Sequence, residues 1–215
     1  MSRYIISITL VISLLIGLVS AEKEEATVKI DETVKEWSLK DTENNMTSFT
    51  QLREDKKSVE QNGKDKNIIV LVFMATQCPA ADDYVERILK LYEDYKEKKV
   101  QFVGIHSNKH ETIDEIKKYQ KKYKFEFPIL IDTENKLADY FQARRTPEVF
   151  LIDESKILRY RGGIDDSRKT PKIHYLSTIL KYIIDGKPIP EKEKKTRAIG
   201  CTIKRVRKTG IDRTP

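Results

Sequence analysis

The chain has 215 residues, 35% of them charged, and a formal net charge of +7 at pH 7. After its first residues the length suits one domain, and no later segment is apolar enough to span a membrane. The charge is uneven, because ten basic and three acidic residues lie between Lys187 and Pro215, whereas Glu22 to Gly186 is close to neutral. With the basicity confined to this tail and no nucleic-acid-binding motif present, we expect no nucleic-acid partner.

The amino terminus has the pattern of a secretory signal peptide. Arg3 precedes an apolar run at 5–19, and Val19-Ser20-Ala21 supplies the small residues of a cleavage site. We therefore predict a signal peptide at 1–21 and an exported protein, periplasmic or extracellular. An uncleaved membrane anchor is the alternative, because roughly 17 to 25 apolar residues can span a bilayer. Residues 22–33 are expected to form a polar, loosely ordered leader.

Predicted strands and helices alternate after this leader. The weakly alternating segment 34–49 contains Trp37 and Leu39 as packing candidates, and the charged stretch 51–67 is interpreted as a helix with a loop or as a mobile insertion. The β-branched run Ile68–Phe73 predicts a strand buried on both faces, as in a parallel sheet.

The remaining elements follow from apolar spacing and turn residues. Cys78-Pro79 opens a helix that runs to about residue 96, because proline suits the first helical position. We predict strands at 100–105, 127–131, 148–152 and 157–160, and helices at 113–123, 135–141 and 174–184. Strands that alternate with helices in this order predict an α/β fold with parallel strands.

Several short segments have the order and spacing of a known family. They are Trp37–Asp41, Phe73–Ala81, Phe127–Asp132, Thr146–Asp153 and Gly162–Asp166. On these segments, residues 34–186 resemble a redoxin domain of the alkyl hydroperoxide reductase and thiol-specific antioxidant type, in the thioredoxin-like superfamily. The resemblance implies a thioredoxin-like α/β fold with a central mixed sheet flanked by helices. It also implies a thiol-dependent oxidoreductase that needs no cofactor and no metal.

Cys78 is the candidate nucleophile. A thiol at the amino terminus of a helix lies near unpaired N–H groups and the positive end of the helix dipole, which favours the reactive thiolate. Asp82 and Asp83 in the first turn would repel a thiolate, and the apolar neighbours Phe73 and Ala75 would desolvate it. A buried, inert cysteine is therefore the alternative.

Two departures from the family pattern narrow the expected chemistry. Ala81 stands where a dithiol thioredoxin has its second cysteine, so disulfide exchange cannot run within one Cys-X-X-Cys motif. Ala75 and Leu71 stand where a peroxiredoxin has a hydroxyl residue and a proline. The hydroxyl that helps to hold a peroxide is thus absent from that position, which puts peroxidase activity in doubt.

Cys201 is the candidate partner of Cys78. It lies in a Gly-Cys-x-Ile segment that also resembles exported redoxin-domain proteins, and we expect Arg197, Lys204 and Arg205 to surround it with positive charge. In one hypothesis, Cys201 resolves a mixed disulfide or a sulfenic acid formed at Cys78. A fixed structural disulfide, or two thiols that never meet, are the alternatives.

Thr146-Pro147 and the histidines complete the set of candidate residues. Thr146-Pro147 resembles the cis-proline corner of the thioredoxin fold, which presents backbone to a substrate thiol, so both residues are predicted to bind substrate. His106 and His110 follow a strand end, where a copper site with Cys78 would be imaginable. We interpret them as part of a solvated loop, because a metal site needs more ligands than the segment offers.

Two functions stay open on the sequence. The first is an exported thiol–disulfide oxidoreductase that uses Cys78, and Cys201 as its partner, on protein thiols or disulfides, a small thiol or a peroxide. The second is a non-catalytic thioredoxin-fold module that binds a peptide or a metal. For the basic tail at 187–215 we expect a solvated extension, with weak contact to a membrane surface as the alternative.

Overall fold

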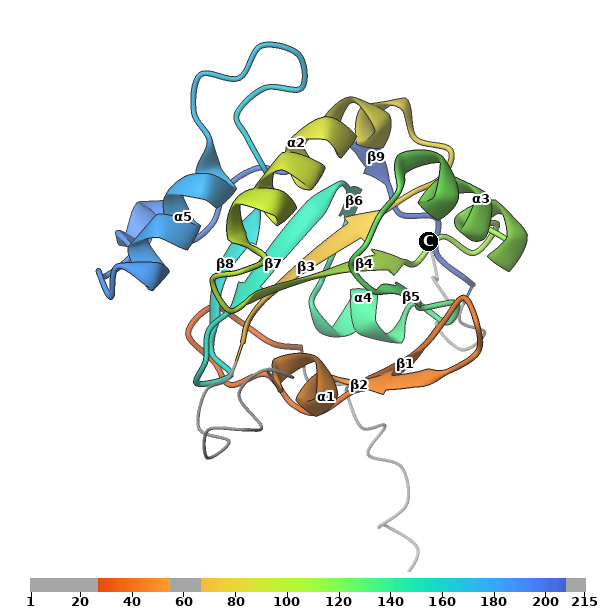
Figure 1. The fold of residues 1–215 in the computed structure, drawn as a ribbon, viewed down its shortest axis with the longest axis horizontal. Coiled ribbons are helices and arrows are strands. Elements are labelled where there is room, and N and C mark those ends of the chain that lie inside the picture. The colour runs from red at the N-terminus through yellow and green to blue at the C-terminus, as the bar shows by residue number, and fades with distance from the viewer. Residues whose placement is uncertain (1–26, 55–66, 208–215) are drawn as a thin grey trace, which may run out of the picture.

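The computed structural model describes residues 27–54 and 67–207, which are built on a seven-stranded sheet in the order β2-β1-β5-β4-β3-β7-β8 (Figure 1). The strands are β1 (Ser38–Asp41), β2 (Met46–Ser48), β3 (Ile68–Met74), β4 (Val100–His106), β5 (Ile129–Ile131), β7 (Glu148–Ile152) and β8 (Leu158–Gly162). A second sheet pairs β6 (Arg145–Thr146) with β9 (Cys201–Thr202). The helices are α1 (Phe49–Arg53), α2 (Pro79–Tyr95), α3 (Ile113–Tyr123), α4 (Lys136–Tyr140) and α5 (Tyr175–Ile184), with a short 3-10 helix, η2 (Glu191–Glu193).

The large sheet is mixed because the chain crosses over between its central strands and turns back tightly at its edges. β3 is parallel to β4 and β4 is parallel to β5, with α2 and α3 as the connecting helices. β7 and β8 form an antiparallel hairpin beside β3, and β1 is antiparallel to β5. The predicted α/β fold, a mixed central sheet flanked by helices, is therefore confirmed.

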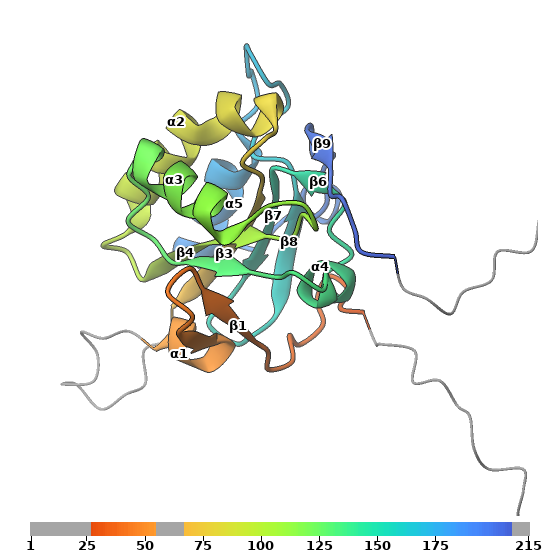
Figure 2. The ribbon, with the colours of Figure 1, turned by 90° about the vertical axis from the view of Figure 1, so that its right-hand side faces the viewer.

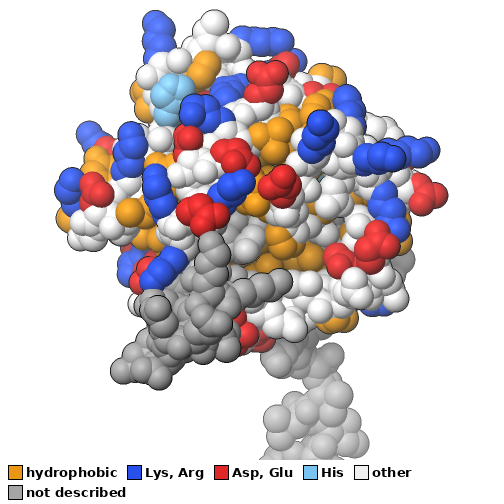
Figure 3. Space-filling view, in the orientation of Figure 1, with side chains coloured by type: hydrophobic (Ala, Val, Ile, Leu, Met, Phe, Trp, Pro, Cys, Tyr) orange, Lys and Arg blue, Asp and Glu red, His pale blue; other side chains and the backbone are white. Residues whose placement is uncertain are grey.

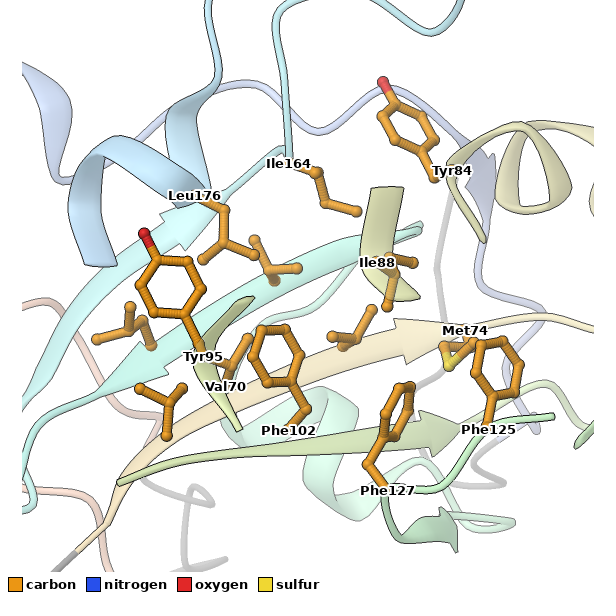
Figure 4. Packing of buried hydrophobic residues seen from close by; sticks show 14 of the residues in the cluster. Val70, Met74, Tyr84, Ile88, Tyr95, Phe102, Phe125, Phe127, Ile164 and Leu176 are labelled. Carbon is orange, nitrogen blue, oxygen red and sulfur yellow. The ribbon is translucent and has the colours of Figure 1, made fainter. Parts of the chain in front are cut away.

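β3 is the centre of the protein, and all of its residues are buried. Successive side chains of a strand point to opposite faces of the sheet. Val70 and Met74 accordingly pack with Phe102 and the helices α2, α3 and α5 on one face (Figure 4). Leu71 and Phe73 pack on the other face, where α1 and α4 lie (Figure 2). Burial on both faces is what the uninterrupted β-branched sequence of this strand predicted.

The chain before β1 packs against the body of the domain from residue 27 onward. The Val28 side chain is 2% exposed, and its N–H donates to the Tyr140 carbonyl over 2.9 Å. Thr33 forms a β-bridge with Ile157. The second half of the expected leader is thus part of the fold, while the predicted signal peptide at 1–21 and residues 22–26 lie outside the described residues.

The basic tail returns along the domain and is not a solvated extension over its described part. The Thr196 hydroxyl lies 2.5 Å from the Tyr160 hydroxyl and accepts the Gly163 N–H over 3.1 Å. A side chain at Gly163 would come within 2.8 Å of the Arg197 carbonyl, so the glycine makes room for the tail. Farther on, Ile203 is 4% exposed and belongs to the core on the α1 and α4 side.

Charges of both signs are interspersed over the face shown in Figure 3, with no large region of one sign. Within residues 27–54 and 67–207, no helix is both long enough and apolar enough to cross a bilayer.

Because Ile203 fills a site in the core, we predict that Ile203→Ala lowers the free energy of unfolding by about 2–5 kcal/mol. Urea denaturation of the oxidised protein measures this loss. Ile173→Ala is the matched control, since Ile173 is 52% exposed and its truncation removes little burial. Equal, small effects of the two substitutions would show that the tail adds nothing to the core.

Candidate active site

The candidate site lies where β3 and β4 end. Met74 of β3 is in register with His106 of β4, and because the strands are parallel, the loops that follow them leave from the same edge of the sheet. The loop after β3 leads to Cys78, and the loop after β4 contains Glu111. The β6–β9 pair lies at this end of the sheet in both views (Figures 1 and 2). The topology therefore gathers four distant segments at one place.

Cys78 is the N-cap residue of α2, and Pro79 occupies the first helical position, as predicted. The Ala81 N–H points at the Cys78 Sγ over 3.4 Å, while the Thr146 carbonyl oxygen lies 3.3 Å from the same sulfur. The N–H would stabilise a thiolate, whereas the carbonyl would oppose it or accept a hydrogen bond from a neutral thiol. The sulfur is thus placed between a donor and an acceptor.

Cys78 and Cys201 are joined by a disulfide that links residues 123 apart in sequence, with 6.1 Å between the two Cα atoms. Cys78 is 2% exposed, and Cys201, which is partly buried, packs against it. The other residues of this small apolar cluster are Ala75, Ala80 and Ala81. The sequence left open a redox-active pair, a structural disulfide and two thiols that never meet. The structure contradicts the last of these three.

The β6 strand faces this disulfide and is fixed by a buried carboxylate. Thr146 is opposite Cys201 in the antiparallel β6–β9 pair, and the Thr146–Pro147 peptide bond is cis, as the family resemblance implied. Glu148, which is 5% exposed, accepts the N–H of Arg144 over 2.6 Å and the N–H of Arg145 over 3.0 Å. Glu148 therefore holds the backbone of β6 from the side of the large sheet.

A second buried carboxylate holds the loop before Cys78. Glu111 accepts the Thr76 N–H over 2.5 Å and the Thr76 hydroxyl over 2.9 Å, and its other oxygen lies 3.0 Å from Nδ1 of His106. Burial alone would raise the pKa of Glu111, but the hydrogen bonds from His106 and Thr76 outweigh it and hold the pKa below its ordinary value. Glu111 is thus ionised at neutral pH and fixes the residue two positions before Cys78.

His106 itself corrects a sequence expectation. It was expected in a solvated loop, yet its side chain is 1% exposed and pairs with Glu111. The last residue of a strand buried on both faces carries its side chain into the protein, which is why the expectation was wrong. Among the described residues, no three His, Cys, Asp or Glu side chains are grouped to hold a metal ion.

The two aspartates in the first turns of α2 both have hydrogen-bond partners, and those of Asp83 are cationic. Asp83 binds Arg168 and the ammonium of Lys169, and the hydrogen bond from Arg168 is the main reason why its pKa is lowered. Asp82 accepts the Tyr119 hydroxyl over 3.1 Å. The repulsion expected between these carboxylates and a Cys78 thiolate is therefore reduced.

The basic side chain beside Cys201 was missed by the sequence analysis. It is Arg145, whose Nη1 donates to the Gly200 carbonyl over 3.2 Å and to the Thr202 hydroxyl over 3.3 Å. Arg205, expected in this role, instead binds Asp139 and the Ala143 carbonyl. Arg145 becomes visible only once the register of β6 and β9 is known, because the two strands are far apart in sequence.

Glu111 and Glu148 were also missed as site residues. Glu148 offered a signal, because a carboxylate that starts an apolar strand directly after Thr146-Pro147 needs a buried partner. Glu111 offered none, since it lies in a polar loop of ordinary composition.

A parallel β-α-β core, an antiparallel hairpin after a cis-proline and a cysteine at the start of a helix define a protein of the thioredoxin-like class. The family model of the AhpC/TSA family matches residues 30–161, more than half of the chain. The chain belongs to this family, as the five short segments that resemble it implied.

Comparisons with individual proteins agree with this assignment. The chain is 28% identical over 107 residues to the thiol-disulfide oxidoreductase ResA of Halalkalibacterium halodurans. This match covers 49% of the chain and 60% of ResA. It therefore spans about three fifths of that relative. An uncharacterized conserved protein from Geobacillus kaustophilus is similar over 85% of this chain and 94% of its own, with 25% identity and a TM-score of 0.71.

The thioredoxin domain of a thiol-disulfide oxidoreductase from Bacteroides vulgatus shares the fold. The match covers 73% of this chain and 99% of that domain, with 12% identity and a TM-score of 0.53. At this identity the likeness concerns the fold alone.

We predict that Glu111→Gln lowers the free energy of unfolding by about 1–3 kcal/mol at pH 7, because charge-assisted hydrogen bonds to Thr76 and His106 are weakened. The pKa of Glu111 is lower in the folded chain than its ordinary value of 4.5. The stabilisation is therefore complete above that value and is lost as the pH falls through the folded pKa.

Urea denaturation at pH 7 and at pH values below the folded pKa measures this difference, which should shrink in acid. Glu126→Gln serves as the control, since the Glu126 side chain is 67% exposed and its partner Lys96 is 3.8 Å away. A Glu111→Gln effect that is unchanged in acid would contradict the assignment of an ionised Glu111.

Proposed function

We propose that the protein is a thiol–disulfide oxidoreductase in which Cys78 and Cys201 form one dithiol–disulfide pair. The observation that carries this proposal is the disulfide between Cys78, the N-cap residue of α2, and Cys201 of β9, next to Thr146-Pro147. At a helix N-terminus, the thiolate form of a cysteine is favoured. The name of the relative ResA supports the same chemistry.

In the proposed reaction, the reduced protein begins with a Cys78 thiolate, which the Ala81 N–H stabilises. The thiolate attacks one sulfur of a substrate disulfide, so that a Cys78–substrate bond forms and the second substrate sulfur leaves as a thiolate. The Cys201 thiolate then attacks the Cys78 Sγ and expels the first substrate sulfur. The substrate gains the two electrons that the Cys78 and Cys201 pair loses, and the reverse sequence oxidises a dithiol.

Thr146 and Pro147 are the proposed substrate-binding residues. The Thr146 carbonyl lies against Cys78, and the Thr146 hydroxyl is buried without a hydrogen-bond partner among the described residues. A buried polar group of this kind costs free energy until it is paired, which suits contact with an incoming ligand. Protein thiols or disulfides, rather than a small thiol, are the proposed substrates.

Peroxide is not the substrate that we propose. Ala75, where a peroxidase of this type carries a hydroxyl, is 4% exposed beside Cys78 and offers no polar group. The expected result is peroxide consumption at the background rate.

A structural disulfide in a non-catalytic binding module is the second candidate function. The burial of Cys78 favours it, because a cysteine that is only 2% exposed is not directly accessible to a substrate. The two functions differ in redox potential, since structural disulfides of exported proteins resist reduction.

We further propose that the protein is exported and acts outside the cytoplasm, in the periplasm or the extracellular space. This rests on the signal-peptide pattern at 1–21 and on the disulfide, which persists in oxidising compartments. Mass determination of the secreted or periplasmic protein would locate the cleavage after Ala21.

We predict that the Cys78–Cys201 disulfide titrates between about −270 and −120 mV, the range of working redox pairs. Mass spectrometry of the alkylated protein in graded thiol–disulfide buffers measures the potential. A value below about −300 mV would assign the disulfide to the structural class and overturn the proposed pair.

Single variants separate the roles of the two sulfurs. Cys78→Ser is expected to abolish disulfide reduction in an insulin or model-peptide assay. Cys201→Ser is expected to stop after the first step and to accumulate a mixed disulfide at Cys78. Accumulation at Cys201 in Cys78→Ser instead would reverse the assignment of nucleophile and resolving residue.

A further inference from the structure

The edge of β6 next to Cys78 is covered by the chain's own strand β9. Thr146 is opposite Cys201 in this pair, and Arg145 is opposite Thr202. Since the Thr146 carbonyl oxygen is 3.3 Å from the Cys78 Sγ, the strand register alone brings the Cys201 sulfur to Cys78. Another extended segment with a cysteine at the same register position would present its sulfur in the same way.

The β6 edge is built to keep its place without β9. Glu148 accepts two backbone N–H groups of the β6 segment, as described above, and Arg161 pairs with Glu148 over 3.3 Å. Arg161 also donates to the Gln142 carbonyl over 2.9 Å. All of these contacts come from within residues 142–161, so none of them is made by β9.

Strand β9 lies between two firm attachments of the tail. On one side, the Thr196 N–H donates to the Arg161 carbonyl over 3.1 Å, and its hydroxyl meets Tyr160. On the other, Ile203 is buried and the Lys204 N–H donates to the Asn108 side chain over 2.8 Å. The segment that would have to leave β6 to free this edge is therefore 197–202, between the two attachments.

Gly200 sets a chemical requirement on whatever occupies this edge. A Cβ atom at position 200 would lie 2.1 Å from the Thr146 carbonyl oxygen and 3.0 Å from the Pro147 nitrogen. Both are backbone atoms that cannot move aside cheaply. The residue before the cysteine must therefore be glycine for the strand to reach this register.

We propose that β9 is a displaceable stand-in for the substrate, and that an extended polypeptide with glycine directly before its cysteine replaces it on β6. This inference rests on the proposed function. In the reducing direction, the substrate strand pairs with β6 while the Cys78–substrate bond forms and the other substrate sulfur leaves as a thiolate. Cys201 then attacks the Cys78 Sγ, the substrate thiolate departs, and β9 pairs with β6 again.

The test uses the full chain with Cys201→Ala and two synthetic peptides. The first peptide, Ala-Ile-Gly-Cys-Thr-Ile-Lys, copies residues 198–204, and the second has alanine in place of its glycine. The equilibrium for mixed-disulfide formation at Cys78 is measured against glutathione by mass spectrometry. We expect the glycine peptide to be favoured over the alanine peptide by about tenfold or more.

A reciprocal variant sharpens the test. Adding Gly200→Ala to the Cys201→Ala chain pushes the chain's own strand away from Thr146, so the glycine peptide should then form more mixed disulfide than with Cys201→Ala alone. Circular dichroism verifies the fold of both proteins.

The outcomes separate this inference from the proposed function. If both peptides and glutathione react equally well at Cys78, the sulfur is redox-active and only the docking of a substrate strand is overturned. If Cys78 forms a mixed disulfide with none of them, the proposed function fails and the inference fails with it. A glycine preference together with the gain from Gly200→Ala supports both.

Discussion

The parallel pairing of β3 with β4 is the constraint from which the rest of the site follows. Because Met74 and His106 end their strands side by side, the loop to Cys78 and the loop to Glu111 emerge together, and Glu111 can hold Thr76. β7 pairs with β3 on the other side and brings Glu148 to the same edge, opposite Phe73. A shift of register in either pair would separate the carboxylates from the backbone that they fix.

The fold could be predicted from the sequence where its signals are local. β3 is recognisable from its apolar, β-branched run, and the start of α2 from Cys78-Pro79, since both features concern consecutive residues. The tail could not be placed, because its buried apolar residue, Ile203, stands among basic residues that suggest solvent exposure. Its attachment depends on space left by glycines in another segment, which no periodicity reveals.

The residues of the candidate site also fall into those that the sequence could predict and those that it could not. Cys78, Cys201 and Thr146-Pro147 could be selected from the sequence, by helix-terminus chemistry and by family resemblance. The buried carboxylates could not, because their role is to bind backbone N–H groups that are brought to them by strand pairing. The hydrogen bond from the Arg145 N–H to the Glu148 carboxylate joins residues that are close in sequence, yet it is informative only when the bend at the cis-proline is known.

The separation of 123 residues between the two cysteines also has a consequence for the order of events during synthesis. Cys78 leaves the ribosome, or enters an oxidising compartment, long before Cys201 exists to protect it. Once β8 has been made, the sheet and α2 can form around a free thiol, which other oxidants can capture until Cys201 follows. Closing so long a loop also lowers the conformational entropy of the unfolded chain, which stabilises the folded state by about 4–5 kcal/mol. The segment around Cys201 therefore secures a sheet and a helix that were made before it.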